Sequence, residues 1–345
     1  MTKKPFDLLA EFAKFGVEKK LSLKDPQAAP AFIKHVDDAV KLALDDPILL
    51  HGQRIEAMFE AMVVSLGAFR LLKPEDNGRI YPGDQFRAPD FRIVLDDGAQ
   101  WLVEVKNIHH IGMLDQKRRV MTRNYRESLE AYAKATGAEL KLAAYWSKWA
   151  IWTLVSPNRL TDADGDVRLD MGTALKANEL GRLGDRTIGT RPPLRLRLTA
   201  DPARTSAIAP DGTVNITISR AQVFCGDKEV TDPVDQEIAW LFMQYGRWEE
   251  AGPDAVVEGD RLEAIEFKWE PTERLNENFE FVGSLSQMFS RYYAEHTVDK
   301  GEIVQLRAPL RPKWFDPLVQ GDRISDALPL WKMVQQPDYG DLGKV

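Results

Sequence analysis

The alternation of apolar and polar side chains between residues 89 and 106 constrains the fold of this chain more than any other feature. Apolar residues occupy every second position in 91–95 and again in 101–105, which is the period of a β-strand. Asp96, Asp97 and Gly98 separate the two segments, and these residue types favour a tight turn because glycine adopts a positive φ at little cost. The pattern therefore predicts a β-hairpin.

Three ionisable residues accompany this hairpin. Asp90 precedes the first strand, and Glu104 and Lys106 lie on one face of the second because successive side chains alternate. We expect strand pairing to bring all three together. Carboxylate oxygens are the ligands that Mg²⁺ prefers, and a neighbouring lysine can position a water and offset charge on phosphorus. The sequence thus predicts a site for Mg²⁺ or Mn²⁺ with Asp90 and Glu104 as ligands.

A Pro-Asp pair followed by Glu-x-Lys resembles the motif of the PD-(D/E)xK nuclease superfamily, which includes restriction endonucleases, Holliday junction resolvases and repair exonucleases. The resemblance implies a restriction-endonuclease-like α/β core, with a mixed sheet flanked by helices. It also implies metal-dependent hydrolysis of DNA phosphodiester bonds that leaves a 5′-phosphate, with Lys106 positioning the attacking water.

The segment before the hairpin carries a candidate for a further acidic residue. Apolar residues recur at helical spacing through 52–66, and Gly67 can end that helix. The run from Gly52 to Glu56 is similar to the opening of archaeal Holliday junction resolvases, and this similarity assigns Glu56 to the metal site as helper ligand or water orienter. Glu60, one turn later, is the alternative candidate, and a solvated glutamate at the helix margin is the other interpretation of Glu56.

The remaining elements of residues 52–155 follow the order of that superfamily. We predict strands at 69–72, 140–146 and 150–155, and a helix over 115–136. The helix begins with a basic cluster that borders the nucleic-acid backbone in the family, although a solvated charged face explains the cluster equally well. The candidate phosphate contacts are Lys117, Arg118, Arg119 and Arg123. Trp146, Trp149 and Trp152 either stack on bases or belong to the core.

A second set of the same residue types lies in the C-terminal third. A helix is predicted at 233–246, a hairpin at 254–268 and a further helix around 285–292. The corresponding candidates are Glu237, Asp254, Glu266 and Lys268. This recurrence of element order fits an active second nuclease module, a duplicated module kept as scaffold, or an accidental match.

Length and composition limit the possible classes of protein. With 345 residues, 44% of them hydrophobic and 29% charged, the chain is long enough for two domains. Its one cysteine, Cys225, and the lack of an apolar run of about 18 residues predict a cytoplasmic protein that neither crosses a membrane nor contains an intrachain disulfide. The net charge of −7 counts against DNA binding over the whole surface.

These observations predict a domain division and a function. We expect a helical extension (1–50), a nuclease domain (51–158), a β-rich connector (159–231), a possible second nuclease-like domain (232–312) and a tail (313–345). The predicted function is that of a Mg²⁺-dependent nuclease acting on DNA in restriction, repair, recombination or phage defence. A homodimer or a recruiting protein partner is possible. The alternative is a non-catalytic nucleic-acid or partner-binding module, in which the acids and lysines form ion pairs.

Overall fold

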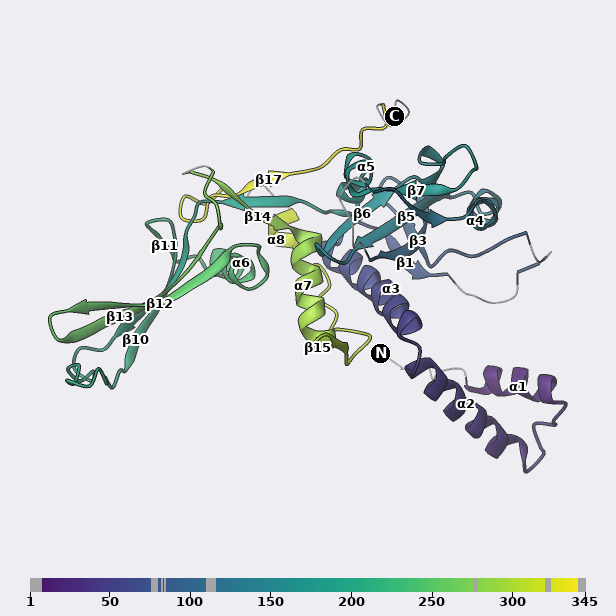
Figure 1. Cartoon of the computed structure of the whole chain (residues 1–345), viewed down its shortest axis with the longest axis horizontal. Coiled ribbons are helices and arrows are strands. Elements are labelled where there is room, and N and C mark those ends of the chain that lie inside the picture. The colour runs from purple at the N-terminus through teal and green to yellow at the C-terminus, as the bar shows by residue number, and fades with distance from the viewer. Residues whose placement is uncertain are drawn as a thin grey trace. The chain divides into compact units, whose positions relative to one another are not determined.

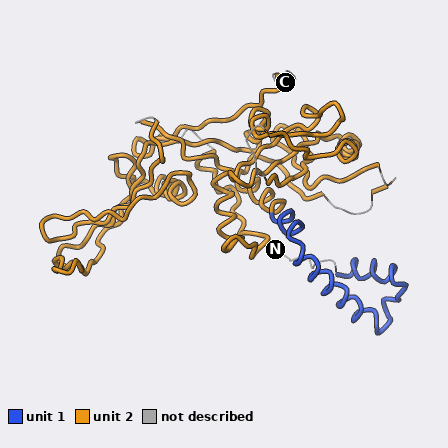
Figure 2. The backbone as a smooth tube through the Cα atoms, in the orientation of Figure 1, with its two compact units in different colours: residues 1–54 blue, residues 55–345 orange. Residues whose placement is uncertain are grey.

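The computed structural model describes residues 8–75, 80–81, 83, 85–109, 116–275, 278–319 and 324–340. The chain divides into two compact units, residues 1–54 and 55–345 (Figure 2). The first unit contains α1 (Leu8–Lys19), α2 (Ala28–Leu44) and the beginning of α3 (Pro47–Leu66). The boundary between the units therefore falls inside α3, close to the predicted end of the helical extension.

A five-stranded mixed sheet forms the core of the N-terminal part of the second unit. Its strands follow the order β1-β2-β3-β5-β6, with β3 and β5 parallel and the other neighbours antiparallel. The strands are β1 (Leu71–Pro74), β2 (Phe91–Val94), β3 (Gln100–Ile108), β5 (Glu139–Trp146) and β6 (Ile151–Val155). The fold is thus α/β with a mixed sheet, as predicted.

Helices cover both faces of this sheet (Figure 1). On one face, the apolar stripe of α3 packs in one core cluster with Val103 and Trp152, and its members Phe59 and Met62 are fully buried. On the other face, Leu102 packs with Leu129 of α4 (Arg123–Ala135) and with residues of α5 (Met171–Lys176). The helical spacing in 52–66 therefore produces the predicted buried face.

The predicted hairpin is present, and its register is regular. Phe91 pairs with Val103, and Val94 pairs with Gln100, so β2 and β3 run antiparallel from the turn back to the open end. Gly98 in the turn adopts a φ of 88°, a conformation that disfavours residues with a Cβ atom. The register brings the residue before β2 alongside the middle of β3.

The prediction of one helix over 115–136 is wrong for the described residues before Arg123. Residues Arg118–Met121 form the strand β4, which pairs antiparallel with β7 (Val167–Leu169). Helix α4 begins after Thr122, whose hydroxyl oxygen accepts a hydrogen bond from the Tyr125 backbone N–H at 3.4 Å. A strand this short depends on its distant partner, so the local pattern does not reveal it. Asp115 lies outside the described residues.

The rest of the second unit is built mainly from antiparallel strands. One sheet has the order β11-β10-β9-β13-β12, and another has the order β14-β8-β17. Their strands are β8 (Thr187–Thr190), β9 (Leu194–Ala200), β10 (Ile218–Cys225), β11 (Lys228–Val230), β12 (Glu249–Glu258), β13 (Arg261–Glu270), β14 (Glu280–Ser284) and β17 (Trp331–Met333). Strands of the predicted connector, 159–231, therefore share sheets with strands of 232–312.

Element order recurs in the C-terminal part, but strand pairing does not. The predicted helices are present as α6 (Pro233–Tyr245) and α7 (Leu285–Thr297), and the predicted hairpin is β12–β13. However, β13 pairs antiparallel with both β9 and β12, and in the described part of the chain no parallel pair corresponds to β3–β5. Directly after α7 the chain forms the short strand β15 (Val298–Asp299), which pairs antiparallel with β16 (Glu302–Ile303). This topology differs from that of the N-terminal core.

Three short helical elements complete the described secondary structure: η1 (Pro157–Arg159), η2 (Leu180–Leu183) and α8 (Asp316–Val319). None of the described helices combines the length and apolar character needed to cross a bilayer.

Candidate functional site

Asp90, Glu104 and Lys106 lie together at the open end of the β2–β3 hairpin. The Asp90 carboxylate accepts a hydrogen bond from the Val105 backbone N–H at 2.7 Å, which holds it against β3. The Lys106 ammonium forms an ion pair with the Glu104 carboxylate, so both side chains lie on one face of the strand. Glu104 is almost completely buried, whereas about a third of the Lys106 side chain is exposed. The structure therefore brings together the three residues of the Pro-Asp and Glu-x-Lys motifs.

The electrostatics of this cluster show an excess of negative charge. Burial, and then the charge of Glu104, raise the pKa of Asp90 to about 7. Burial alone would lower the pKa of Lys106, but the neighbouring Glu104 outweighs burial and raises it. The cluster therefore holds a firmly protonated lysine and a carboxylate, that of Asp90, whose charged form is disfavoured by burial and by Glu104.

Glu56 belongs to the same electrostatic cluster. Its pKa is raised by burial and then by the charge of Glu104, while Lys106 acts in the opposite direction. The alternative candidate, Glu60, instead forms an ion pair with Arg307 at 3.1 Å. Of the two glutamates on α3, Glu56 is thus the one that interacts with the motif residues.

The donor set fits a hard divalent cation held largely by water and substrate. In the part of the chain that the structure describes, no three His, Cys, Asp or Glu side chains are grouped tightly enough to enclose a metal ion by themselves. Mg²⁺ in phosphoryl-transfer sites commonly takes only one or two carboxylates and completes its shell with waters and phosphate oxygens. Asp90 and Glu104 can supply such a pair, and a dication there would offset the repulsion from Glu104 that adds to burial in raising the pKa of Asp90.

Tyr125 is a member of this site that the motif did not reveal. Its hydroxyl donates a hydrogen bond to Glu104 Oε1 at 2.5 Å, and burial, followed by the charge of Glu104, raises its pKa to about 12. The Lys106 Nζ atom lies 5.1 Å from the centroid of the Tyr125 ring. From the sequence, Tyr125 is indistinguishable from the other apolar-face residues of its helix, and only the N-cap at Thr122 would have placed it in the first turn.

The four predicted phosphate-contacting residues do not share one helix face. Arg118 donates to the His109 carbonyl at 2.9 Å, Arg119 lies 3.3 Å from Asp166, and Arg123 pairs with its helix neighbour Glu127. Lys117 is exposed and precedes β4. Three of the four cations therefore have partners within this chain.

The tryptophans near the sheet belong mainly to the core. Trp146 and Trp152 are buried, and the indole N–H of Trp152 donates to Ser290 at 3.1 Å. Trp149 alone of the three is partly exposed. Stacking of bases on Trp146 or Trp152 is thus excluded in this conformation.

The C-terminal set is organised differently. Asp254 pairs in register with Glu266, and Lys268 contacts Asp254 at 2.9 Å. Glu266, however, forms ion pairs with Arg197 at 2.8 Å and with Arg195 at 3.6 Å, so cations of this chain already offset its charge. The fourth candidate, Glu237, is exposed on α6, and among the described contacts no hydrogen bond or ion pair joins it to the other three.

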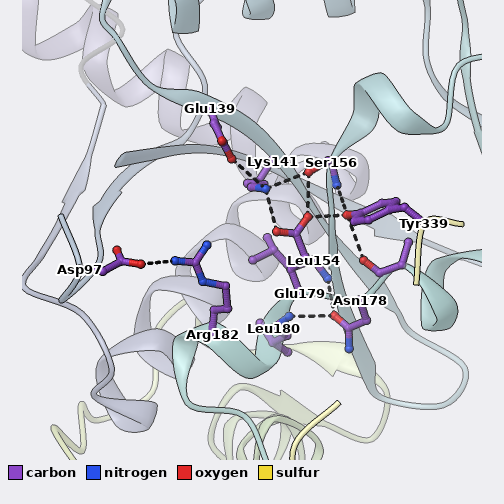
Figure 3. Close-up of polar contacts among 11 residues, drawn as sticks. Asp97, Glu139, Lys141, Leu154, Ser156, Asn178, Glu179, Leu180, Arg182 and Tyr339 are labelled. Atoms are coloured by element: carbon purple, nitrogen blue, oxygen red, sulfur yellow. Dashed lines mark hydrogen bonds and ion pairs between the residues drawn. The ribbon is translucent and has the colours of Figure 1, made fainter. Parts of the chain in front are cut away.

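A second buried polar cluster, around Lys141 near the start of β5, is shown in Figure 3. It lines a cavity of about 630 Å³. Lys141 donates to Ser156 and to Glu179, each at 2.8 Å, and Tyr339 from the C-terminal segment donates its hydroxyl to the same glutamate. Arg182, also shown there, pairs with Asp97 across the hairpin turn. Because Lys141 and Glu179 neutralise each other, we interpret this cluster as a structural contact that anchors the C-terminal segment through Tyr339.

Comparison with known proteins gives only distant structural similarity. No protein-family model matches the chain, and no curated protein matches it. Among solved structures, the chain is similar to Hjc of Archaeoglobus fulgidus, a Holliday junction resolvase from an archaeal hyperthermophile, with 18% identity and a TM-score of 0.28. The matched region covers 36% of this chain and 91% of the resolvase. At this TM-score the match carries no argument for function, which has to be argued from the site.

Proposed function

We propose that this chain is a metal-dependent nuclease that hydrolyses DNA phosphodiester bonds, in restriction, repair, recombination or phage defence. The observation that supports the proposal is the meeting of Asp90, Glu104 and Lys106 at one end of a hairpin, with a pKa of about 7 for Asp90. A carboxylate whose pKa is raised this strongly, by burial and then by a neighbouring charge, is typical of functional sites.

Each residue of the cluster has a distinct role in the proposed reaction. Asp90 and Glu104 would hold Mg²⁺ or Mn²⁺, with Glu56 as helper ligand or water orienter. When bound, the ion polarises a phosphoryl oxygen and lowers the pKa of water. Lys106, partly exposed and kept protonated by Glu104, is suited to orient the attacking water and to offset charge that develops on phosphorus.

The competing proposal is a non-catalytic nucleic-acid or partner-binding module. The Lys106–Glu104 ion pair and the Tyr125 hydrogen bond favour it, since both stabilise Glu104 without a metal. A metal distinguishes the two proposals. A nuclease site should gain thermal stability from Mn²⁺ or Mg²⁺, because an ion that binds only the folded state stabilises it, whereas a self-satisfied cluster should gain nothing.

The direct test is cleavage of linear, circular, branched and single-stranded DNA with and without Mg²⁺ or Mn²⁺. We expect metal-dependent cleavage by the purified chain and its loss in Asp90→Asn and Lys106→Met, by at least about 100-fold for each group that stabilises the transition state. Both substitutions keep the side-chain size, so the fold should persist.

A matched control is Lys268→Met in the C-terminal hairpin, which removes the corresponding lysine of the second Glu-x-Lys set. We expect this variant to cleave like the unaltered chain. Full cleavage by the Asp90 or Lys106 variant would refute the assignment, and loss of cleavage only in Lys268→Met would move the site to the C-terminal set.

A further inference from the structure

The first unit of the chain, considered by itself, buries very little apolar surface. Helices α1 and α2 meet through Phe32, whose ring centroid lies 5.3 Å from that of Phe12 and 5.5 Å from that of Phe15. Within described residues 8–54, the buried apolar side chains are those of Phe15, Ala28 and Phe32. A helical hairpin of this size does not form an adequate core alone, so a further partner surface is required for its stability.

One side of α2 carries an exposed apolar stripe. Its members are Ile33, Val36, Val40 and Leu44, which recur every three or four residues and so lie on one side of the helix. Their exposed fractions are 68%, 38%, 51% and 61%. We refer to these four residues as the α2 stripe. Leu42 is also exposed but lies on the opposite side of the helix, about 180° from Ile33 at 100° per residue.

The charges of the unit argue for a neutral protein partner. Helix α1 carries two acidic and two basic residues, and α2 likewise carries two of each. Without a net positive charge, these helices are poorly suited to a nucleic-acid backbone or to an anionic membrane, which attract Lys- and Arg-rich surfaces. We therefore expect the partner of the α2 stripe to be a protein surface that is apolar and carries equal numbers of positive and negative charges.

A second copy of α2 offers such a surface with matching charges. When two α2 helices pack antiparallel about a two-fold axis at Asp38, Val36 of each copy lies opposite Val40 of the other. The same arrangement brings Asp37 of one copy to the side of Lys41 of the other, offset by about 3 Å along the axis at 1.5 Å per residue. Within one copy these residues already form an exposed ion pair at 2.6 Å, so both are free to exchange partners across the contact.

We propose that the α2 stripe is a self-association surface, through which two copies of this chain pack α2 against α2 in antiparallel orientation. The contact would bury apolar side chains that are exposed in a single copy and would give each hairpin the core that it lacks. The proposal does not depend on the nuclease assignment, because none of its residues belongs to that site.

The first test is the mass of the full chain in solution, measured by sedimentation over a wide range of concentration. We expect a dimer. Val40→Asp should raise its dissociation constant more than about tenfold, since a charge replaces a valine that the dimer contact would bury. Leu42→Asp, on the opposite side of α2, should leave the dimer unchanged. A monomer at every concentration, or equal weakening by both variants, would overturn the proposal.

Charge reversal tests the antiparallel arrangement. Asp37→Lys and Lys41→Asp should each weaken self-association, because like charges then meet across the contact. A mixture of the two variants should form a heterodimer, in which every facing pair is again attractive. Helical content measured by circular dichroism serves as the control for folding. Failure of the mixture to associate would rule out this pairing, because the exposed positions tolerate either charge within a single helix.

Discussion

At the scale of the residue, the candidate site depends on which groups neutralise and hydrogen-bond the buried carboxylate of Glu104. Its carboxylate receives the Lys106 ammonium and the Tyr125 hydroxyl, both on the side of β3 that faces α4. The contact of Lys106 with Glu104 could be predicted from the sequence, because residues two apart on a strand share a face. The contact of Tyr125 with Glu104 could not be predicted, because it depends on where α4 begins and on how that helix packs over the sheet.

Replacement of Tyr125 by phenylalanine tests this balance. We expect Tyr125→Phe to lower the free energy of unfolding in metal-free buffer by about 1.5–3 kcal/mol, the typical value of a hydrogen bond to a charged group. The added stability from Mn²⁺ should then exceed that of the unaltered chain, because Glu104 has lost a competing donor. Thermal unfolding with and without Mn²⁺ measures both effects.

The matched control for that substitution is Tyr132→Phe on the same helix. Tyr132 also donates to a carboxylate, that of Glu75 at 2.7 Å, and none of its described side-chain contacts is to Asp90, Glu104 or Lys106. It should lose comparable stability while its response to Mn²⁺ stays unchanged. An identical response to Mn²⁺ in both tyrosine variants would contradict the assigned role of Tyr125.

At the scale of the element, predictions succeeded where a segment's neighbours in sequence determine its structure. The β2–β3 hairpin and α3 followed from period-two and helical spacing, and the register of the hairpin placed Asp90 correctly. Strand β4 was missed because its pairing with β7 is distant in sequence. The same limit applies to β5. Its strand structure could be predicted locally, but the ion pair of its buried Lys141 with Glu179 could not, because the two residues are distant in sequence.

The buried Lys141–Glu179 pair predicts a large effect of a single substitution. Both side chains are less than a tenth exposed, so Lys141→Met leaves an uncompensated buried carboxylate. We expect a loss of about 3–5 kcal/mol in the free energy of unfolding. The double variant Lys141→Met with Glu179→Gln should recover part of this loss, as measured by urea denaturation. A loss no larger than that of an exposed pair such as Lys41–Asp37 would contradict this interpretation.

The same pair predicts a contribution to stability that depends on pH. Burial alone would raise the pKa of Glu179, but hydrogen bonds from Lys141, Tyr339 and Ser156 outweigh burial and lower it below the ordinary value of 4.5. A lowered folded-state pKa stabilises the protein fully above the unfolded value and loses that effect as the pH falls through the folded value. Stability should therefore decline below about pH 4.5, and less steeply in Glu179→Gln. Parallel pH profiles for the two proteins would show that Glu179 does not contribute.

At the scale of the whole molecule, the net charge of −7 limits how the chain meets a polyanion. Attraction to DNA then has to come from a few local cations, and the candidates Lys117, Arg118, Arg119 and Arg123 flank or form β4 and the start of α4. Most of them already have partners in this chain. Strand pairings between the predicted connector and the C-terminal region, such as β9 with β13, also belong to this scale, and no local pattern predicted them.

The salt dependence of DNA binding tests the cationic contacts. If all four contact phosphates, the logarithm of the binding constant should fall with the logarithm of salt concentration with a slope of about −3.6, and Lys117→Ala should reduce the slope by about 1. Fluorescence anisotropy between low and moderate salt, with the metal replaced by Ca²⁺ to prevent cleavage, gives both slopes. An unchanged slope in Lys117→Ala would remove this residue from the interface.

The pairing of β8 has a consequence for how the chain is made. This strand, Thr187–Thr190, lies between β14 and β17, and neither neighbour has been synthesised when β8 leaves the ribosome. Likewise, the hydrogen bond to Glu179 can form only after Tyr339, 160 residues later in the chain, has been synthesised. Translation must therefore proceed through residue 339 before this region can close, and until then the nascent polypeptide presents unpaired strand edges that are targets for chaperones.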